Sequence, residues 1–142
     1  MSDRPEALPP EDVHEFVRTA HGGFDEVRAM LDREPALVNA AWDWGGGDWE
    51  TGLGAAAHMG RRDIAELLLD RGARLDLFAA AMLGNVEVVR AILEAFPAMR
   101  EAAGPHGIPL IEHARKGGPE ATAVAELLEG TPVVPRWVKV VT

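Results

Sequence analysis

The chain has 142 residues, of which 47% are hydrophobic and 26% charged, as in a single folded domain. It has no cysteine, which excludes disulfides and thiolate metal sites and is typical of the reducing cytoplasm. A net charge of −9 disfavours nucleic acid and anionic membrane surfaces as partners. The N-terminus does not resemble a signal peptide, and no apolar run approaches the roughly 20 residues that span a bilayer. We therefore expect a cytoplasmic protein with neither a nucleic-acid nor a membrane partner.

The first part of the chain predicts a leader and one pair of helices. Residues 1–10 are expected to be a frayed leader, because the prolines at positions 5, 9 and 10 disfavour helix. Residues 11–20 and 25–33 then carry apolar side chains three and four positions apart, which is the spacing of one helical stripe. The second stripe falls four, seven and eight positions after Gly23 and consists of Val27, Met30 and Leu31.

Residues 40–51 (AAWDWGGGDWET), which we call the finger, differ in composition from the rest of the chain. Three consecutive glycines predict the turn of a short hairpin. Three of the four tryptophans lie here among acidic residues: Trp42, Asp43, Trp44, Asp48, Trp49 and Glu50. Either the indoles fold back and fill space inside the fold, or they form a surface for a ligand or partner, where tryptophan is favoured.

Residues 53–73 predict a second pair of helices. An alanine-rich segment, 53–58, ends near Gly60, and a second helix, 63–70, ends before Gly72, which can take the left-handed conformation common after helices. Its stripe again falls four, seven and eight positions after a glycine and consists of Ile64, Leu67 and Leu68. Helices of about two turns cannot bury their apolar faces alone, so the pair is expected to be one unit of a stack.

The same pattern recurs twice more before it ends. Gly84 follows Gly60 by 24 residues, and Asn85 is placed to cap the next helix. Gly117 then follows Gly84 by 33 residues. Residues 131–142 contain two prolines near their start, which disfavour helix there. We expect this segment to be an extended cap packed on the last helix pair, with a displaced or partner-bound strand as the alternative.

These repeats resemble the ankyrin family, whose repeat has a period of about 33 residues. The matching residues are Thr51, Leu53, Ala56, Ala57, Gly60, Ile64, Leu67, Leu68, Leu69, Gly72 and Ala73. Gly52 and Gly54 depart from the pattern, because they replace the usual proline and histidine. The resemblance implies an all-α ankyrin-repeat solenoid of about four helix pairs, with one short finger hairpin and an extended C-terminal cap. The repeats would span about 11–40, 41–76, 77–104 and 105–130.

The resemblance also implies where some side chains lie. Four residues share one repeat position: His21, His58, Met82 and Arg115. In ankyrin stacks this position faces the concave groove, so the column would line the groove beside the finger, as a binding surface or as plain solvated surface. The three finger indoles would form one wall of it. His106 aligns with Trp49 at the start of a finger, while His113 aligns with a core position and is expected to be buried and hydrogen-bonded.

Spacing along the chain gives little sign of catalysis or of metal binding. No two histidines stand four positions apart on one helix, as in zinc proteases, and we expect no metal and no other cofactor. The sequence also lacks a nucleophile elbow, a Walker loop and a dinucleotide fingerprint. Carboxylates beside indoles can have a raised pKa, which suits acid–base chemistry. The candidates for it are Asp43, Asp48, Glu50 and His58.

From these features we expect a binding module that recognises a protein partner through the groove and the finger, rather than an enzyme. The expected binding residues are Trp42, Asp43, Trp44, Asp48, Trp49, Glu50, His21, His58, Met82 and Arg115. The alternative is a small-molecule-binding protein or acid–base enzyme, with a Trp-lined acidic pocket between the finger and His58. A deep pocket with two carboxylates would favour the alternative, and an open groove the protein partner.

Overall fold

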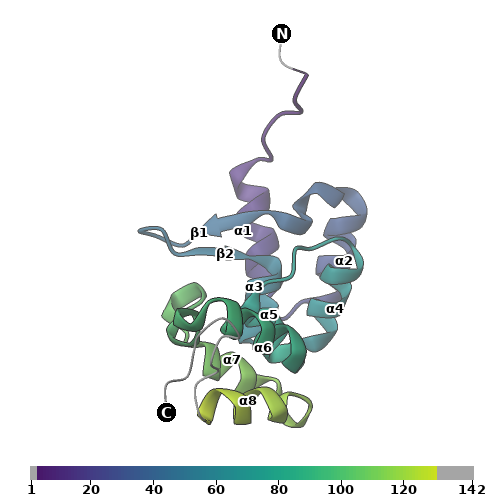
Figure 1. The fold of residues 1–142 in the computed structure, drawn as a ribbon. Coiled ribbons are helices and arrows are strands. Elements are labelled where there is room, and N and C mark those ends of the chain that lie inside the picture. Colours follow the sequence, from purple (N-terminus) through teal and green to yellow (C-terminus); the bar gives the residue numbers. More distant parts are fainter. Residues whose placement is uncertain (1–2, 131–142) are drawn as a thin grey trace.

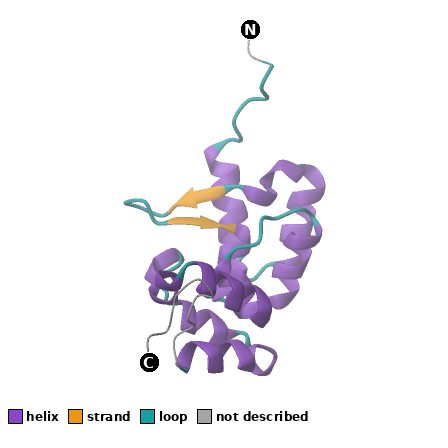
Figure 2. Ribbon diagram, in the orientation of Figure 1, coloured by secondary structure: helices purple, strands orange, loops and turns teal. Residues whose placement is uncertain are grey.

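The computed structural model describes residues 3–130 and is mostly helical, with one hairpin of strands β1 (Ala41–Asp43) and β2 (Trp49–Thr51) (Figure 1, Figure 2). The prediction of a mainly helical chain with one short hairpin is confirmed. The predicted C-terminal cap, 131–142, lies outside the described residues. Within the described part, no helix exceeds ten residues, and none is long and apolar enough to cross a membrane.

The α-helices of residues 3–130 form four consecutive pairs. These are α1 (Pro10–Thr19) with α2 (Phe24–Arg33), α3 (Gly52–His58) with α4 (Arg62–Asp70), α5 (Leu77–Leu83) with α6 (Val86–Ala95), and α7 (Leu110–Lys116) with α8 (Thr122–Glu129). The first helices contact one another in chain order, α1 with α3, α3 with α5, and α5 with α7. Short 3₁₀ helices complete the chain: η1 (Pro35–Asn39), η2 (Pro97–Glu101), η3 (Pro105–Gly107) and η4 (Gly118–Ala121).

Glycines at two of the turns let the fourth helix pair approach closely. Gly60 and Gly84 have positive φ values of 68° and 81°, a region that glycine enters at little cost. A Cβ atom at Gly84 would lie 2.1 Å from the backbone oxygen of Glu120, and one at Gly60 would lie 2.7 Å from that of Lys116. No side chain fits at such distances, so this packing requires glycine at both turns.

The core is built around small side chains on the first helices of the pairs. In α3 every residue except His58 is buried, and the alanines of α5 are buried as well. These small residues allow neighbouring helices to lie close together, while large side chains such as Phe16 and Leu68 fill the remaining space. Met82 belongs to the same core and is fully buried. The prediction that it faces a groove is therefore wrong.

Leu68 of α4 offers a direct test of this core. Its side chain is fully buried, whereas that of its neighbour Leu67 is only partly buried. We expect Leu68→Ala to lower the free energy of unfolding by about 2–5 kcal/mol, as at other buried leucines, and Leu67→Ala to lower it less. Urea unfolding of both variants measures the difference. Equal losses would mean that α4 presents another face to the core.

The finger places its side chains on two opposite faces. β1 and β2 pair antiparallel with Trp42 directly opposite Glu50, so these two side chains lie on the same face. The carboxylate of Asp43 holds the turn, because it accepts the backbone N–H groups of Gly45 and Gly47 at 2.9 and 3.0 Å. Since β1 also contacts α1, the finger is fixed beside the first helix.

Candidate metal centre

A buried carboxylate lies where three imidazole rings converge. The side chain of Glu50 has no exposed surface. His21 Nε2 lies 3.1 Å from its Oε1, while His58 Nε2 and His106 Nε2 lie 3.0 and 3.2 Å from its Oε2. The indole N–H of Trp44 donates to Oε1 at 3.0 Å. We call His21, Glu50, His58 and His106 the histidine cluster.

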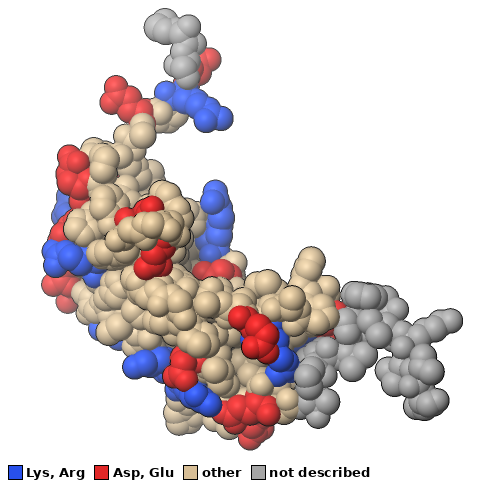
Figure 3. All heavy atoms as spheres, turned by 90° about the vertical axis from the view of Figure 1, so that its left-hand side faces the viewer, with Lys and Arg blue, Asp and Glu red and all other residues tan. Residues whose placement is uncertain are grey.

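The histidine cluster is assembled from four separate segments of the chain. His21 follows α1, Glu50 lies on β2, and His58 is the last residue of α3. His106 lies on η3, 48 residues after His58. The contacts of α3 with α1, with β2 and with α7 bring these segments together, at the base of the hairpin that projects from the molecule in Figure 1. On this side of the molecule, acidic and basic side chains are interspersed (Figure 3).

Asp48 holds His106 in an unusual backbone conformation. His106 has a φ of 62° and is the only non-glycine residue of the described chain with a positive φ. Such a conformation costs about 1–3 kcal/mol. The Asp48 carboxylate accepts the backbone N–H of His106 at 2.8 Å and lies 2.8 Å from its Nδ1. The backbone hydrogen bond is the main reason that the pKa of Asp48 is lowered. These contacts fix the ring with Nε2 directed at Glu50.

The second ring nitrogens determine what the Nε2 atoms can do. His21 Nδ1 lies 3.0 and 3.1 Å from the carbonyl oxygens of Val17 and Arg18, and carbonyls only accept, so this nitrogen carries a proton. His106 Nδ1 faces the Asp48 carboxylate in the same way. In a neutral imidazole the other nitrogen then has a free lone pair. Both Nε2 atoms are therefore set up as metal ligands, because metal-binding histidines usually donate their other ring N–H to a carbonyl or carboxylate oxygen.

Without a metal ion, protons on the imidazoles must offset the negative charge of the buried Glu50 carboxylate. The hydrogen bond to Glu50 raises the pKa of His21, although burial opposes this. Burial alone would raise the pKa of Glu50, but the close imidazoles of His21 and His58 lower it to about 2. Glu50 Oε2 and His58 Nε2 are 3.0 Å apart, yet their angles do not make a hydrogen bond. A short distance without alignment is not a hydrogen bond, so both buried atoms lack a hydrogen-bond partner within the described chain.

The donor set fits a transition-metal ion. One ligand atom from each residue of the histidine cluster lies within 4.8 Å of the others. Two ligands of one tetrahedral ion stand about 3.3 Å apart when the bonds are about 2.0–2.1 Å, close to the 3.0–3.2 Å between Glu50 and the imidazoles. Three nitrogens and one carboxylate suit zinc, iron, cobalt, nickel or copper, whereas calcium and magnesium prefer oxygen alone.

Of the other sequence-predicted residues, Trp44 and Asp48 contact this cluster, whereas the structure separates the rest from it. Trp42 packs on His14, and Trp49 lies on the opposite face of the finger with 60% of its surface exposed. The three indoles therefore do not form one wall. The carboxylate of Asp43 instead accepts the backbone N–H groups of the finger turn. Arg115 pairs with Glu112 and Glu129 on the surface of the last helix pair, so it does not line a column with the histidines.

His113 and His106 were not among the predicted binding residues, and the structure places both of them. His113 is fully buried with Nδ1 3.0 Å from the carbonyl oxygen of Pro109, as predicted, and burial lowers its pKa. His106 was expected at the start of a finger and was missed as a member of the cluster. The available signal was its setting, a histidine between Pro105 and two further turn formers, Gly107 and Pro109, rather than within a helix.

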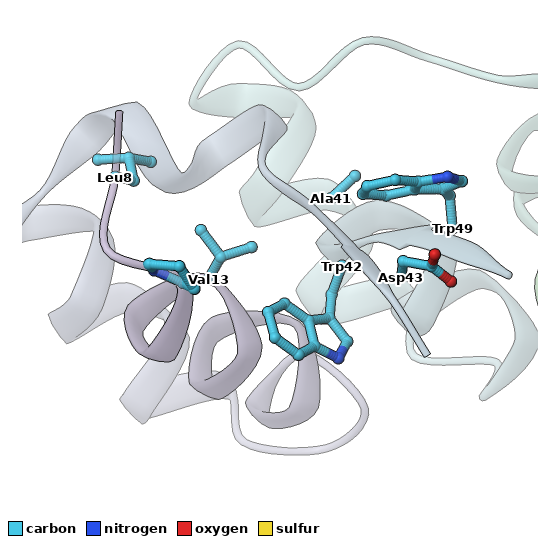
Figure 4. A pocket seen from close by; sticks show the side chains of 7 residues that line it. Leu8, Val13, Ala41, Trp42, Asp43 and Trp49 are labelled. Atoms are coloured by element: carbon cyan, nitrogen blue, oxygen red, sulfur yellow. The ribbon is translucent and has the colours of Figure 1, made fainter. Parts of the chain in front are cut away.

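A separate pocket of about 330 Å³ lies between the start of α1 and β1 (Figure 4). It is lined by Leu8, Pro10, Val13, Ala41, Trp42, Asp43 and Trp49. Only one of these residues is a carboxylate, and none belongs to the histidine cluster. It is therefore a different place from the acidic pocket beside His58 that the sequence suggested as an alternative.

No family model, curated protein or solved structure matches this chain. The function is accordingly inferred from the geometry of the cluster and from the chemistry of its residues.

Proposed function

We propose that this chain binds one divalent transition-metal ion through the histidine cluster. The observation that carries the proposal is the fully buried Glu50 carboxylate facing three Nε2 atoms. A buried charge is costly unless it is paired or coordinates a metal, and here one carboxylate oxygen and one imidazole nitrogen are left without hydrogen bonds. A cation among the three rings would satisfy both.

The sequence-based expectation of no metal relied on the spacing of histidines along one helix. The ligands proposed here come from the turn after α1 and from β2, α3 and η3 instead, so that spacing does not apply to them. Isothermal titration of the chelator-treated protein tests the proposal. We expect one equivalent of Zn²⁺ or Co²⁺ to bind with a Kd below about 1 μM, and an excess of about 100 Kd to stabilise the fold by about 2.7 kcal/mol. Absence of saturable binding by either ion would contradict it.

The variant His106→Asn tests the imidazole as a metal ligand without changing the backbone conformation of residue 106. Asparagine tolerates a positive φ better than most residues, so the loop should keep its shape while the imidazole ligand is lost. We expect Zn²⁺ affinity to fall at least about tenfold, with the metal-free unfolding free energy within about 1 kcal/mol of the original. Calorimetric titration and urea unfolding measure the two quantities. His14→Asn is the matched control, because His14 lies outside the cluster and should leave Zn²⁺ affinity unchanged.

We propose further that the four helix pairs form an ankyrin-repeat solenoid. The ordered contacts of α1, α3, α5 and α7 support this, as do the turn glycines of the second and third pairs. Asn39 adds a tie typical of stacked units, since its side chain donates to the carbonyl of Gly72 and accepts from the N–H of Arg74. An experimentally determined structure tests the proposal by the superposition of successive helix pairs.

A protein partner on the finger stays a second proposal, supported by the exposed indole of Trp49. The acid–base alternative would use Glu50 and His58 without a metal. It differs from the metal proposal in one respect: ligand binding or turnover would persist after chelation. Trp49→Ala would weaken a finger-bound protein partner and leave Zn²⁺ binding unchanged, which separates the partner proposal from the other two.

A further inference from the structure

We propose that the bound metal accepts a fifth ligand on its solvent side, beyond the four protein donors, and that this position takes a small anion carrying a flat ring. The inference rests on the proposed metal site and specifies the ligand that this site would accept.

The protein donors approach the metal from one side. Glu50 forms the floor, because its side chain has no exposed surface. The three imidazoles surround it and become more exposed outward, with 11% of the His58 side chain exposed, 25% of His21 and 33% of His106. No further cysteine, histidine or carboxylate of the described residues joins the group from the outer side. Solvent therefore reaches the face of the metal opposite Glu50.

Trp44 stands at the widest gap between the rings. The centroids of His21 and His58 are 4.9 Å apart and those of His58 and His106 are 5.3 Å apart, whereas His21 and His106 are separated by 6.4 Å. The Trp44 ring lies 6.2 Å from His21 and 6.0 Å from His106. Its N–H is committed to Glu50, so the indole is a wall of the opening and not a ligand.

An aromatic row continues away from this opening. His14 meets Trp44 edge to face at 5.3 Å and stacks on Trp42 at 4.7 Å. All three residues of the row, Trp42, His14 and Trp44, are partly exposed. Aromatic rings favour offset stacking or edge-to-face contact with another ring. A ligand held on the metal by one end would place a flat ring against this row.

The charge of the site selects the donor atom of the ligand. Three neutral imidazoles and one carboxylate leave a divalent ion with one unit of positive charge. Asp48 contacts Nδ1 of His106, the ring nitrogen that faces away from the metal, so its charge acts on the ion only from across that ring. An anionic oxygen donor, such as a carboxylate, therefore suits the open position better than a cation or an apolar group. An aromatic carboxylate combines this donor with the ring that the aromatic row favours.

The Co²⁺-loaded protein tests the inference, because its visible absorption reports a change of ligands. Benzoate and acetate share the donor and differ in the ring. We expect both to change the spectrum, with benzoate binding about tenfold more tightly, within the range of an aromatic contact. His14→Ala should reduce this preference and leave acetate affinity unchanged, whereas Trp49→Ala, on the opposite face of the finger, should leave both unchanged.

The outcomes separate this inference from the metal proposal. A Co²⁺ spectrum that forms normally but responds to neither anion would mean a closed coordination shell, which overturns the inference and leaves metal binding intact. Equal affinities for benzoate and acetate would overturn the aromatic part and with it the ligand class. Failure of Co²⁺ to bind at all would overturn the metal proposal itself.

Discussion

Glu50→Gln is expected to lower Zn²⁺ affinity at least about 100-fold and to destabilise the metal-free chain. Loss of the groups that hydrogen-bond to metal ligands already costs about 10–100-fold in metal affinity. Glu50 is itself a proposed ligand and, among the described residues, supplies the only negative charge within bonding reach of all three imidazoles. In the metal-free chain the amide also replaces an anionic acceptor by a weaker neutral one. We expect a loss of about 1–3 kcal/mol in unfolding free energy from this change.

Glu66→Gln is the matched control for this variant. Glu66 is exposed on α4 and away from the cluster, so the same chemical change should alter neither quantity. Calorimetric titration gives the affinity and urea unfolding in the presence of chelator gives the stability. If Glu50→Gln bound Zn²⁺ as tightly as the original chain, the carboxylate would not be a ligand, and the site would have to rely on the three histidines alone.

The helix pairs could be predicted because their signals are local. The stripe of Ile64 and Leu68 and the turn at Gly60 depend on residues a few positions apart, and the structure has a helix pair there. Burial was harder to predict. Met82 was assigned to a surface by analogy between repeats, but the third pair lacks a finger, and its side chain packs into the core cluster instead.

The histidine cluster could be predicted only in part. Repeat alignment singled out His21 and His58, and the unusual composition of the finger drew attention to Glu50. His106 escaped because its position depends on a left-handed backbone residue and on Asp48, a partner 58 positions earlier. Neither leaves a periodic signal in the sequence. A metal centre assembled from four segments is visible only once tertiary contacts place those segments side by side.

As the pH rises above the ordinary pKa of histidine, the metal-free chain should lose stability, whereas the stabilisation by Zn²⁺ should grow. Because the pKa of Glu50 is lowered from 4.5 to about 2, its stabilising contribution is present above pH 4.5 and is lost as the pH falls toward 2. Because the pKa of His21 is raised above 6.5, its contribution is complete below pH 6.5 and is lost as the pH rises through the raised value. The contributions of these two groups to metal-free stability are therefore both complete between pH 4.5 and 6.5.

Metal binding reverses the alkaline part of this dependence. A metal ion competes with protons for the Nε2 atoms, so the stabilisation by Zn²⁺ grows as the pH rises. Thermal melts at pH 5.5 and 8.0, with chelator or with Zn²⁺, should show a small metal-induced rise in Tm at the lower pH and a large one at the higher pH. His21→Asn should weaken the alkaline loss of stability in chelator, because it removes the imidazolium that pairs with Glu50. A metal-induced rise that is equal at both pH values would mean that Zn²⁺ binds at groups that do not titrate in this range, and hence outside the histidine cluster.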